Sequence, residues 1–337
     1  MNMNLLSSQI AQRGRTLIEL LIAMTIGLVI VVGVSSLYLS SSGLSRTANQ
    51  LSTVEQAGHL ALLIIGDSLK TGGYGEIVGS DFAAQGQTLM DGVHLRGCTG
   101  TQFADPFPPY VLVPGVQTPP DLSCTAASGG DALYVRHQSG PIVAEMTAAE
   151  AARLQQLDCT ASALNQDQVL DASQFRPGSG LVRSIVTNVF VRDPFNNTLN
   201  CRGYGGGVYQ TLLRDVTDFR VFYRFDDVAR AAGAHGATNA APFGGSIRDA
   251  TYINGLPNAP VDPWNYVVAV MVCITIQTGE LGLSVDPSAT GSRCPVNAAE
   301  AESGLNLTAP IVGGQIPRTF SQVFTVRARA TASPSIL

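Results

Sequence analysis

The sequence predicts an α+β protein in which one long N-terminal helix packs on a C-terminal domain of antiparallel β-sheet with long loops. Two observations carry this prediction. All 18 prolines lie at or after Pro106, so residues 15–70 can form a helix that no proline interrupts. Beyond Val93, short runs of β-branched and aromatic residues alternate with turn residues, which is typical of antiparallel strands.

The first half of the helix, residues 15–40, has the composition of a membrane span. Residues 20–39 contain no charged side chain. About 20 helical residues at a rise of about 1.5 Å cover roughly 30 Å, the thickness of a bilayer core. The rest of the chain is interrupted by Gly, Pro, Asp and Arg, which excludes a polytopic membrane protein. We therefore expect one transmembrane helix.

Residues 41–70 continue the same helix in amphipathic form, because apolar residues recur at helical spacing among Ser, Thr, Asn, Gln and Arg. This half is expected to pack on protein. Gly43 and Gly58 each weaken a helix by about 1 kcal/mol relative to Ala, which favours a bend or local melting there. The run Thr71-Gly-Gly-Tyr-Gly is expected to end the helix. Residues 71–337 then form one β-rich globular domain.

Within that domain the pattern predicts strands, one short helix and long loops. The expected strands are 132–137, 181–192, 208–213, 216–225, 265–278 and 319–329. Alternation over 216–225 predicts one face exposed to water, whereas the apolar run within 265–278 predicts a central strand covered on both faces. Residues 147–157 are expected to form a helix with Thr147 and Glu150 as its capping box. The Gly/Pro-rich segments 99–130, 231–263 and 279–318 are expected to be surface loops.

The charge balance argues against nucleic acid as a partner. The chain has 20 basic and 25 acidic residues, a net charge of −5, and Lys70 is its one lysine. Generic nucleic-acid binding needs a basic face that displaces counterions from the phosphates. We therefore expect no nucleic-acid partner.

The six cysteines include no Cys-x-x-Cys pair, which argues against zinc-ribbon and thioredoxin-like sites. An even number in an exported domain indicates disulfides, and six cysteines allow 15 pairings. Local pairing closes loops of roughly 20–30 residues, each stabilising by roughly 3 kcal/mol. It favours two bridges and leaves a third by elimination: Cys98–Cys124, Cys273–Cys294 and Cys159–Cys201. The alternative is that Cys273, in an apolar strand, is a free core thiol.

Residue patterns for catalysis or cofactor binding are not found in the sequence. The histidines form no metal-binding spacing: His59, His94, His137 and His235. The run Gly203-Tyr-Gly-Gly-Gly-Val lacks the third glycine of a dinucleotide fingerprint, because Val208 occupies that position. Asp226 and Asp227 lack the glycine spacing of a calcium loop and are interpreted as a solvated strand end. We expect no enzymatic activity, no metal and no cofactor.

The chemically informative motif is at the N-terminus. Six positions match those of type IV prepilins: Gly14, Thr16, Leu17, Ile18, Glu19 and Leu20. The chain resembles this family, in which a short polar leader ends in glycine and a Thr-Leu-Ile-Glu-Leu stretch opens an apolar helix. The resemblance implies a pilin-like fold and cleavage of the leader, residues 1–14, by a prepilin peptidase. The family usually has Phe as the first mature residue, but this chain has Arg15, which leaves methylation of the new amine open.

A carboxylate at Glu19 is expensive in an apolar helix, roughly 2.5–3.5 kcal/mol for a charged group at mid-membrane and less near the interface. It therefore needs a partner. The resemblance implies that the partner is the free α-amine of a neighbouring subunit, which sets the register of assembly. The alternative is a pair with Arg15 four residues earlier on the same helix, worth only tenths of a kcal/mol when exposed.

The length of 337 residues suggests a minor rather than a major subunit. The chain is most similar to PilW-type minor pilins, on the helix exit and on looser patterns around residues 216–223, 264–270 and 318–327. The resemblance implies a single-pass inner-membrane protein with a periplasmic domain that joins the pilus at the cell surface and helps to start its assembly near the tip. Implied partners are other minor pilins, the major pilin and a tip adhesin. The alternatives are a J-type minor pseudopilin of type II secretion and a membrane-anchored periplasmic enzyme.

Overall fold

The computed structural model describes most of the chain, with gaps. The described residues are 16–74, 94–106, 121–125, 129–143, 158–161, 169–171, 181–203, 208–227, 230, 245–257, 262–277, 290–304, 307–311 and 316–326. The chain divides into two compact units, a first unit of Met1–Ser52 and a second unit of Thr53–Leu337. Each unit is described by itself below.

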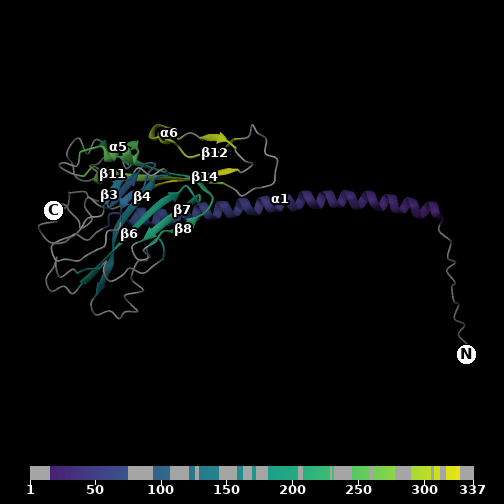
Figure 1. The fold of residues 1–337 in the computed structure, drawn as a ribbon, viewed down its shortest axis with the longest axis horizontal. Helices are drawn as coiled ribbons and strands as arrows, with labels where there is room; N and C mark the ends of the chain where they lie inside the picture. The colour runs from purple at the N-terminus through teal and green to yellow at the C-terminus, as the bar shows by residue number, and fades with distance from the viewer. Residues whose placement is uncertain are drawn as a thin grey trace, which may run out of the picture. The chain divides into compact units, whose positions relative to one another are not determined.

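The helix α1 (Leu17–Thr71) contains 55 residues and contributes to both units (Figure 1). The local melting that we expected at Gly43 and Gly58 does not occur, because the helix is continuous through both positions. The helix ends where the sequence predicts. Gly73 adopts a positive φ of 78°, which glycine tolerates without strain, and its N–H donates to the carbonyl of Arg136.

The second unit contains two larger antiparallel sheets among its described residues. One has the strand order β10 (Ser246–Arg248), β9 (Val216–Phe225), β11 (Val267–Gln277) and β14 (Pro317–Thr325). The other has the order β1 (Leu95–Cys98), β4 (Ala132–Val143), β6 (Leu181–Asp193), β7 (Thr198–Gly203) and β8 (Gln210–Leu213), and β5 (Val169–Asp171) also pairs with β6. The structure therefore confirms the predicted fold class of a long N-terminal helix followed by an antiparallel sheet domain.

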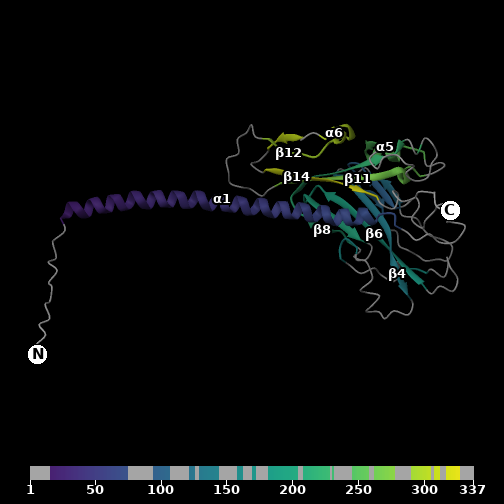
Figure 2. The same ribbon diagram turned by 180° about the vertical axis from the view of Figure 1, so that it is seen from behind.

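The core of the second unit lies where the last part of α1 meets both sheets. Ile65 and Leu69 of α1 are fully buried, in one cluster with Phe190 of β6 and Val272 of β11. Figure 2 shows β11 and β14 on one side of this helix segment and β6 and β8 on the other. Residues 53–71 thus form a central layer, because their apolar stripe has a sheet to pack on in two directions.

Two short hairpins cover the outer faces of these sheets. The hairpin of β2 (Phe103–Asp105) and β3 (Asp121–Cys124) packs Phe103 against Tyr134 of β4. The hairpin of β12 (Thr290–Ser292) and β13 (Thr308–Pro310) accompanies α6 (Ala298–Ser303), whose Ala301 packs against Phe222 of β9. This cover explains why Phe222 is buried, although it alternates in register with the charged Asp218 and Arg220 of the same strand.

Two further short elements close one end of the core. Asp249 caps α5 (Ala250–Asn254) by accepting the Tyr252 N–H at 2.8 Å. Asp262 caps the 3₁₀ helix η3 (Pro263–Tyr266) by accepting the Trp264 N–H at 3.0 Å. The regions 99–130, 231–263 and 279–318, which we expected to be surface loops, therefore contain hairpins and short helices. The expected helix 147–157 lies outside the described residues.

Candidate functional site

The N-terminal motif coincides with the start of α1. Gly14 and Arg15, the expected cleavage position, lie outside the described residues. The carbonyl of Thr16 accepts the N–H groups of Glu19 at 3.1 Å and Leu20 at 3.3 Å, which begins the helix. Glu19 thus lies in the first turn, where the positive end of the helix dipole favours a carboxylate.

The Glu19 side chain is exposed and makes no ion pair with another described residue. The helix dipole contributes at most about 1 kcal/mol at an exposed position. Because Arg15 is outside the described residues, both partners considered for Glu19 stay predictions. The geometry leaves this carboxylate available to a cation that approaches the start of the helix.

The large apolar side chains of residues 17–39, in the first unit, are exposed to solvent in the single chain. They are Leu17, Ile18, Leu20, Leu21, Ile22, Met24, Ile26, Leu28, Val29, Ile30, Val31, Val32, Val34, Leu37, Tyr38 and Leu39. Covering such a side chain stabilises by about 1.5–3 kcal/mol. Among the described residues, α1 is the one helix long and apolar enough to cross a membrane. The helix and the motif together fit membrane anchoring.

Three hydroxyl groups of the first unit suit an apolar environment. The hydroxyls of Thr25, Ser36 and Ser42 donate to the carbonyls three residues earlier, at 2.9, 2.8 and 2.9 Å. A hydroxyl that is satisfied within its own helix needs no water, so it can enter lipid or a helix interface at low cost. Beyond the backbone of their own helix turns and their chain neighbours, Gly27 and Gly33 have no atom within 4 Å of the position a Cβ would take.

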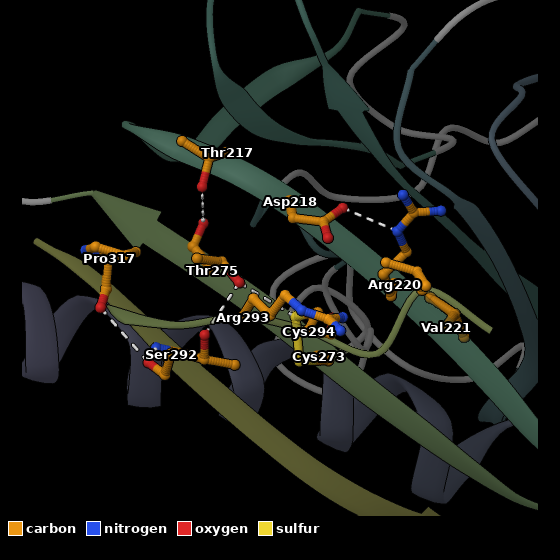
Figure 3. Close-up of a disulfide and its surroundings, with 12 residues drawn as sticks. Thr217, Asp218, Arg220, Val221, Cys273, Thr275, Ser292, Arg293, Cys294 and Pro317 are labelled. Carbon is orange, nitrogen blue, oxygen red and sulfur yellow. Dashed lines mark hydrogen bonds and ion pairs between the residues drawn. A yellow bond between two sulfur atoms is a disulfide. The ribbon is translucent and has the colours of Figure 1, made fainter. Parts of the chain in front are cut away.

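The structure forms three disulfides, and they are the pairs that local pairing and elimination predict. The Cα atoms are 5.6 Å apart in Cys98–Cys124, 6.3 Å in Cys159–Cys201 and 5.8 Å in Cys273–Cys294. These distances lie within the range that a disulfide requires. The alternative of a free Cys273 is therefore wrong, because its partner on the neighbouring segment lies directly over the strand (Figure 3).

Each disulfide joins a peripheral segment to a strand of a sheet. Cys98–Cys124 attaches the β2–β3 hairpin to β1, and Cys273–Cys294 attaches the segment between β12 and α6 to β11. Cys159–Cys201 attaches residues 158–161 to β7. Asn188 supports this third bridge, because its Oδ1 accepts the Cys159 N–H at 2.9 Å and its Nδ2 donates to Ser68 of α1 at 2.9 Å.

A buried carboxylate that sequence reasoning missed connects the two sheets. Asp131, which precedes β4, accepts the N–H groups of Val221 at 2.8 Å and Gly100 at 2.9 Å, and its own N–H donates to Phe219. Burial raises the pKa of Asp131 to about 6, although these hydrogen bonds and Arg220, 3.7 Å away, oppose the rise. Asp131 accepts an N–H of β9 and donates to a carbonyl of β9, as a neighbouring strand would, so its role is structural. Its sequence context, Gly-Gly-Asp, indicates only a turn.

The remaining acidic and histidine side chains of the described residues were compared with the pattern of a metal site. No cluster of three metal-binding side chains occurs in the part of the chain that the structure describes. The interpretation of Asp226 as solvated is wrong, because this residue is only 4% exposed and its N–H donates to Tyr266. Asp227 accepts from Ser246 and lies 3.4 Å from Arg248. His235 lies outside the described ranges.

Comparison with known proteins gives two findings. Residues 10–35 match the model of the prokaryotic N-terminal methylation motif. A type IV-like pilin from Thermus thermophilus is 13% identical, with 85% of this chain and 99% of that chain covered, and the TM-score is 0.34. No curated protein gives a significant match.

The motif match spans the residues that the sequence analysis singled out, from the expected leader to the apolar helix. The chain thus carries a prepilin-type N-terminal methylation motif on a long apolar helix that is followed by an antiparallel sheet domain. Such a motif implies processing by a prepilin peptidase and assembly with other pilins.

Proposed function

We propose that the chain is a minor pilin, a structural subunit without enzymatic activity that helps to start type IV pilus assembly and lies at or near the pilus tip. The observation that supports this most directly is the position of Glu19, five residues after Gly14 and in the first turn of an exposed apolar helix. The resemblance to PilW-type minor pilins assigns the finer role.

In this proposal a prepilin peptidase removes residues 1–14 and creates an α-amine on Arg15. Residues 15–40 anchor the protein in the inner membrane, and the helix continuation 41–70 and domain 71–337 lie in the periplasm until the subunit enters the pilus. Glu19 then pairs with the α-amine of a neighbouring minor or major pilin. An ion pair in an apolar helix bundle is strongly position-dependent, since a carboxylate left unpaired there costs several kcal/mol.

The second candidate is a J-type minor pseudopilin of type II secretion, because the same motif and helix serve both systems. The Gly/Pro-rich segments and the six cysteines of the domain favour the pilus. Neighbours that co-purify with sheared filaments distinguish the two: minor pilins and a tip adhesin on one side, components of a secretion system on the other. A membrane-anchored enzyme would retain residues 1–14 in the mature protein.

The mass of the mature N-terminus tests the processing step. We expect the membrane-extracted protein to begin at Arg15, and mass spectrometry also shows whether that amine is methylated. A mature protein that begins at Met1 or Met3 would contradict the proposal. Methylation has no bearing on cleavage, so either methylation state agrees with it.

The role of Glu19 is tested by Glu19→Ala, with Glu55→Ala as the matched control on the same helix. Glu19→Ala should insert into the membrane normally, because removing a charge favours the bilayer. Its recovery in sheared filaments should fall at least about tenfold, which corresponds to about 1.4 kcal/mol of lost pairing. Glu55, which is exposed in the second unit, should be replaceable without loss. Equal recovery of Glu19→Ala and wild type would show that register is set elsewhere.

A further inference from the structure

The three disulfides differ in how far their cysteines are buried. Both cysteines of Cys273–Cys294 are buried, at 1% and 0% exposure, and the Thr275 hydroxyl lies 3.3 Å from the Cys294 Sγ (Figure 3). In Cys159–Cys201, Cys201 is fully buried in the main core of the second unit and Cys159 is half-buried against it. The folded chain therefore shields these two bridges from a reagent in solvent.

The Cys98–Cys124 bridge is open to solvent on one side. Cys98 is 1% exposed and belongs to a smaller apolar cluster with Tyr134 and Val189. Cys124, on β3, is exposed. All six cysteines are described, and Cys124 is the one among them that is exposed. A reagent that attacks this bridge in the folded protein therefore reaches it from the side of Cys124.

Asn254, the last residue of α5, lies against the exposed side of this bridge. Its Nδ2 lies 3.5 Å from the Cys124 Sγ and donates to the Gly97 carbonyl at 3.0 Å. Its Oδ1 accepts the Trp264 indole N–H at 2.9 Å. The amide has two N–H groups, so one can bond Gly97 while the other faces the sulfur. Such a donor stabilises negative charge that forms on the Cys124 Sγ.

We propose that Cys98–Cys124 is a thiol–disulfide exchange site, at which a dithiol oxidoreductase opens this bridge in the folded domain and leaves the other two closed. Exposed disulfides are the ones that exchange readily, whereas buried ones resist reduction. The proposal goes beyond pilus assembly, because it depends only on the second unit.

The exchange has two steps. A thiolate of the dithiol attacks the Cys124 Sγ and forms a mixed disulfide, while the Cys98–Cys124 bond breaks and its electron pair leaves on Cys98. Cys98 then takes up a proton, because its apolar surroundings disfavour a thiolate. In the second step the other thiol of the dithiol, as a thiolate, attacks its own partner sulfur and expels Cys124 as a thiolate beside the Asn254 amide. The dithiol loses two electrons, and its two protons end on the two cysteines.

Opening this bridge releases the β2–β3 hairpin from its covalent attachment to β1. The pairing of β2 with β3 and the packing of Phe103 on Tyr134 do not depend on the bridge, so the hairpin itself persists. The contact of Asn254 with the Cys124 Sγ changes, and Asn254 also bonds Trp264, the single tryptophan. The fluorescence of Trp264 should therefore report the opening.

Dithiothreitol, as the dithiol probe, tests the order of opening on the full chain in detergent. Samples are quenched with acid, unfolded and alkylated, and peptide mapping follows each cysteine. We expect Cys98 and Cys124 to appear as thiols at least about tenfold faster than the other four, at a rate proportional to the dithiothreitol concentration. The urea-unfolded chain is the control, and its three bridges should open at similar rates. Equal native rates, earlier opening of another bridge, or a rate independent of dithiothreitol would each overturn the proposal.

Two single variants test the side of attack. Cys98→Ala leaves Cys124 as a thiol, and Cys124→Ala leaves Cys98 as a thiol. With oxidised glutathione, we expect the Cys124 thiol to form a mixed disulfide at least about tenfold faster than the Cys98 thiol, because only the former is exposed. Equal reactivity, or faster reaction of Cys98, would show that the approach from Cys124 is wrong.

Two double variants test the link to Trp264. Removal of both Cys98 and Cys124 should abolish the early fluorescence change that dithiothreitol causes, whereas removal of both Cys159 and Cys201 should preserve it. An early change that survives without Cys98 and Cys124 would contradict the proposal. None of these results bears on cleavage after Gly14, so failure here and failure of the proposed function are distinguishable.

Discussion

The two parts of α1 both carry many apolar side chains, but they differ in how far those side chains are buried. Over residues 17–39 the large apolar side chains are exposed, whereas over residues 53–71 Leu62, Ile65 and Leu69 are buried between two sheets. The second part finds its packing partner within the chain. The first part needs lipid or other subunits. One continuous helix thus combines a half that is packed within its own chain with a half whose large apolar side chains are exposed.

The glycines of α1 show the same difference. A Cβ at Gly58 would lie 2.6 Å from the Phe320 ring, and one at Gly66 would collide with Phe324. Gly27, Gly33 and Gly43 have open space around them. A glycine in the second unit therefore permits close approach of a neighbouring strand, at the usual cost of about 1 kcal/mol in helix propensity. The three open glycines have no such role within the single chain.

The largest effect on the free energy of unfolding should come from removing the aromatic ring of Phe324, which packs β14 against α1. Phe324 is 3% exposed, so Phe324→Ala should destabilise the second unit by about 3–5 kcal/mol through lost burial and a cavity. Denaturant unfolding in detergent, followed by the fluorescence of the single tryptophan, Trp264, measures this change. The neighbouring Val323→Ala should change the free energy of unfolding by less than about 0.5 kcal/mol. Equal effects of both substitutions would mean that α1 does not pack on β14.

A smaller effect on the free energy of unfolding should follow from adding a side chain to α1 at the point where Gly66 contacts Phe324. Gly66→Leu should destabilise by about 2 kcal/mol, because overpacking against Phe324 outweighs the gain in helix propensity. The matched control is Gly33→Leu in the first unit, where open space surrounds the glycine. It should leave the unfolding transition reported by Trp264 unchanged. If Gly66→Leu were as stable as Gly33→Leu, the close packing inferred at Gly66 would be wrong.

The smallest of these effects on the free energy of unfolding should be a pH dependence in the second unit, caused by Asp131. The pKa of Asp131 rises from 3.8 to about 6 through burial, so the folded protein binds this proton more tightly than the unfolded chain does. Stability from this group therefore decreases as the pH rises through 6. Relative to Asp131→Asn, the wild type should gain about 1.4 kcal/mol between pH 7.5 and pH 5, out of about 3 kcal/mol in all.

The charged groups that act on Asp131 remain in this comparison, because Arg220 and Asp218 are present in both proteins. Unfolding of the two proteins in parallel at each pH therefore isolates the contribution of this carboxyl. A difference that stays constant with pH would show that Asp131 titrates normally in the folded state.

Strand positions could be predicted where local pattern and burial agree. The strand expected at 216–225 is β9 with the same bounds, and those expected at 181–192 and 265–278 are β6 and β11 within a few residues. Eight of the described strands were not expected: β1, β2, β3, β5, β7, β10, β12 and β13. All except the six-residue β7 contain three or four residues, too few for periodicity to distinguish them from a loop.

The N-terminal motif and the apolar run follow from the order of residues alone, because each depends on spacing over a short stretch of chain. Local spacing also favoured two of the disulfides, Cys98–Cys124 and Cys273–Cys294, whereas Cys159–Cys201 was reached only by elimination. The burial of Asp131 and the close contacts of Gly58 and Gly66 could be seen only in the folded chain. Each arises between segments that are distant in sequence: the Asp131 carboxylate accepts the Val221 N–H, and the two glycines face side chains of β14. Local composition does not encode such long-range contacts, since the same residues would suit a turn or a weak helix position.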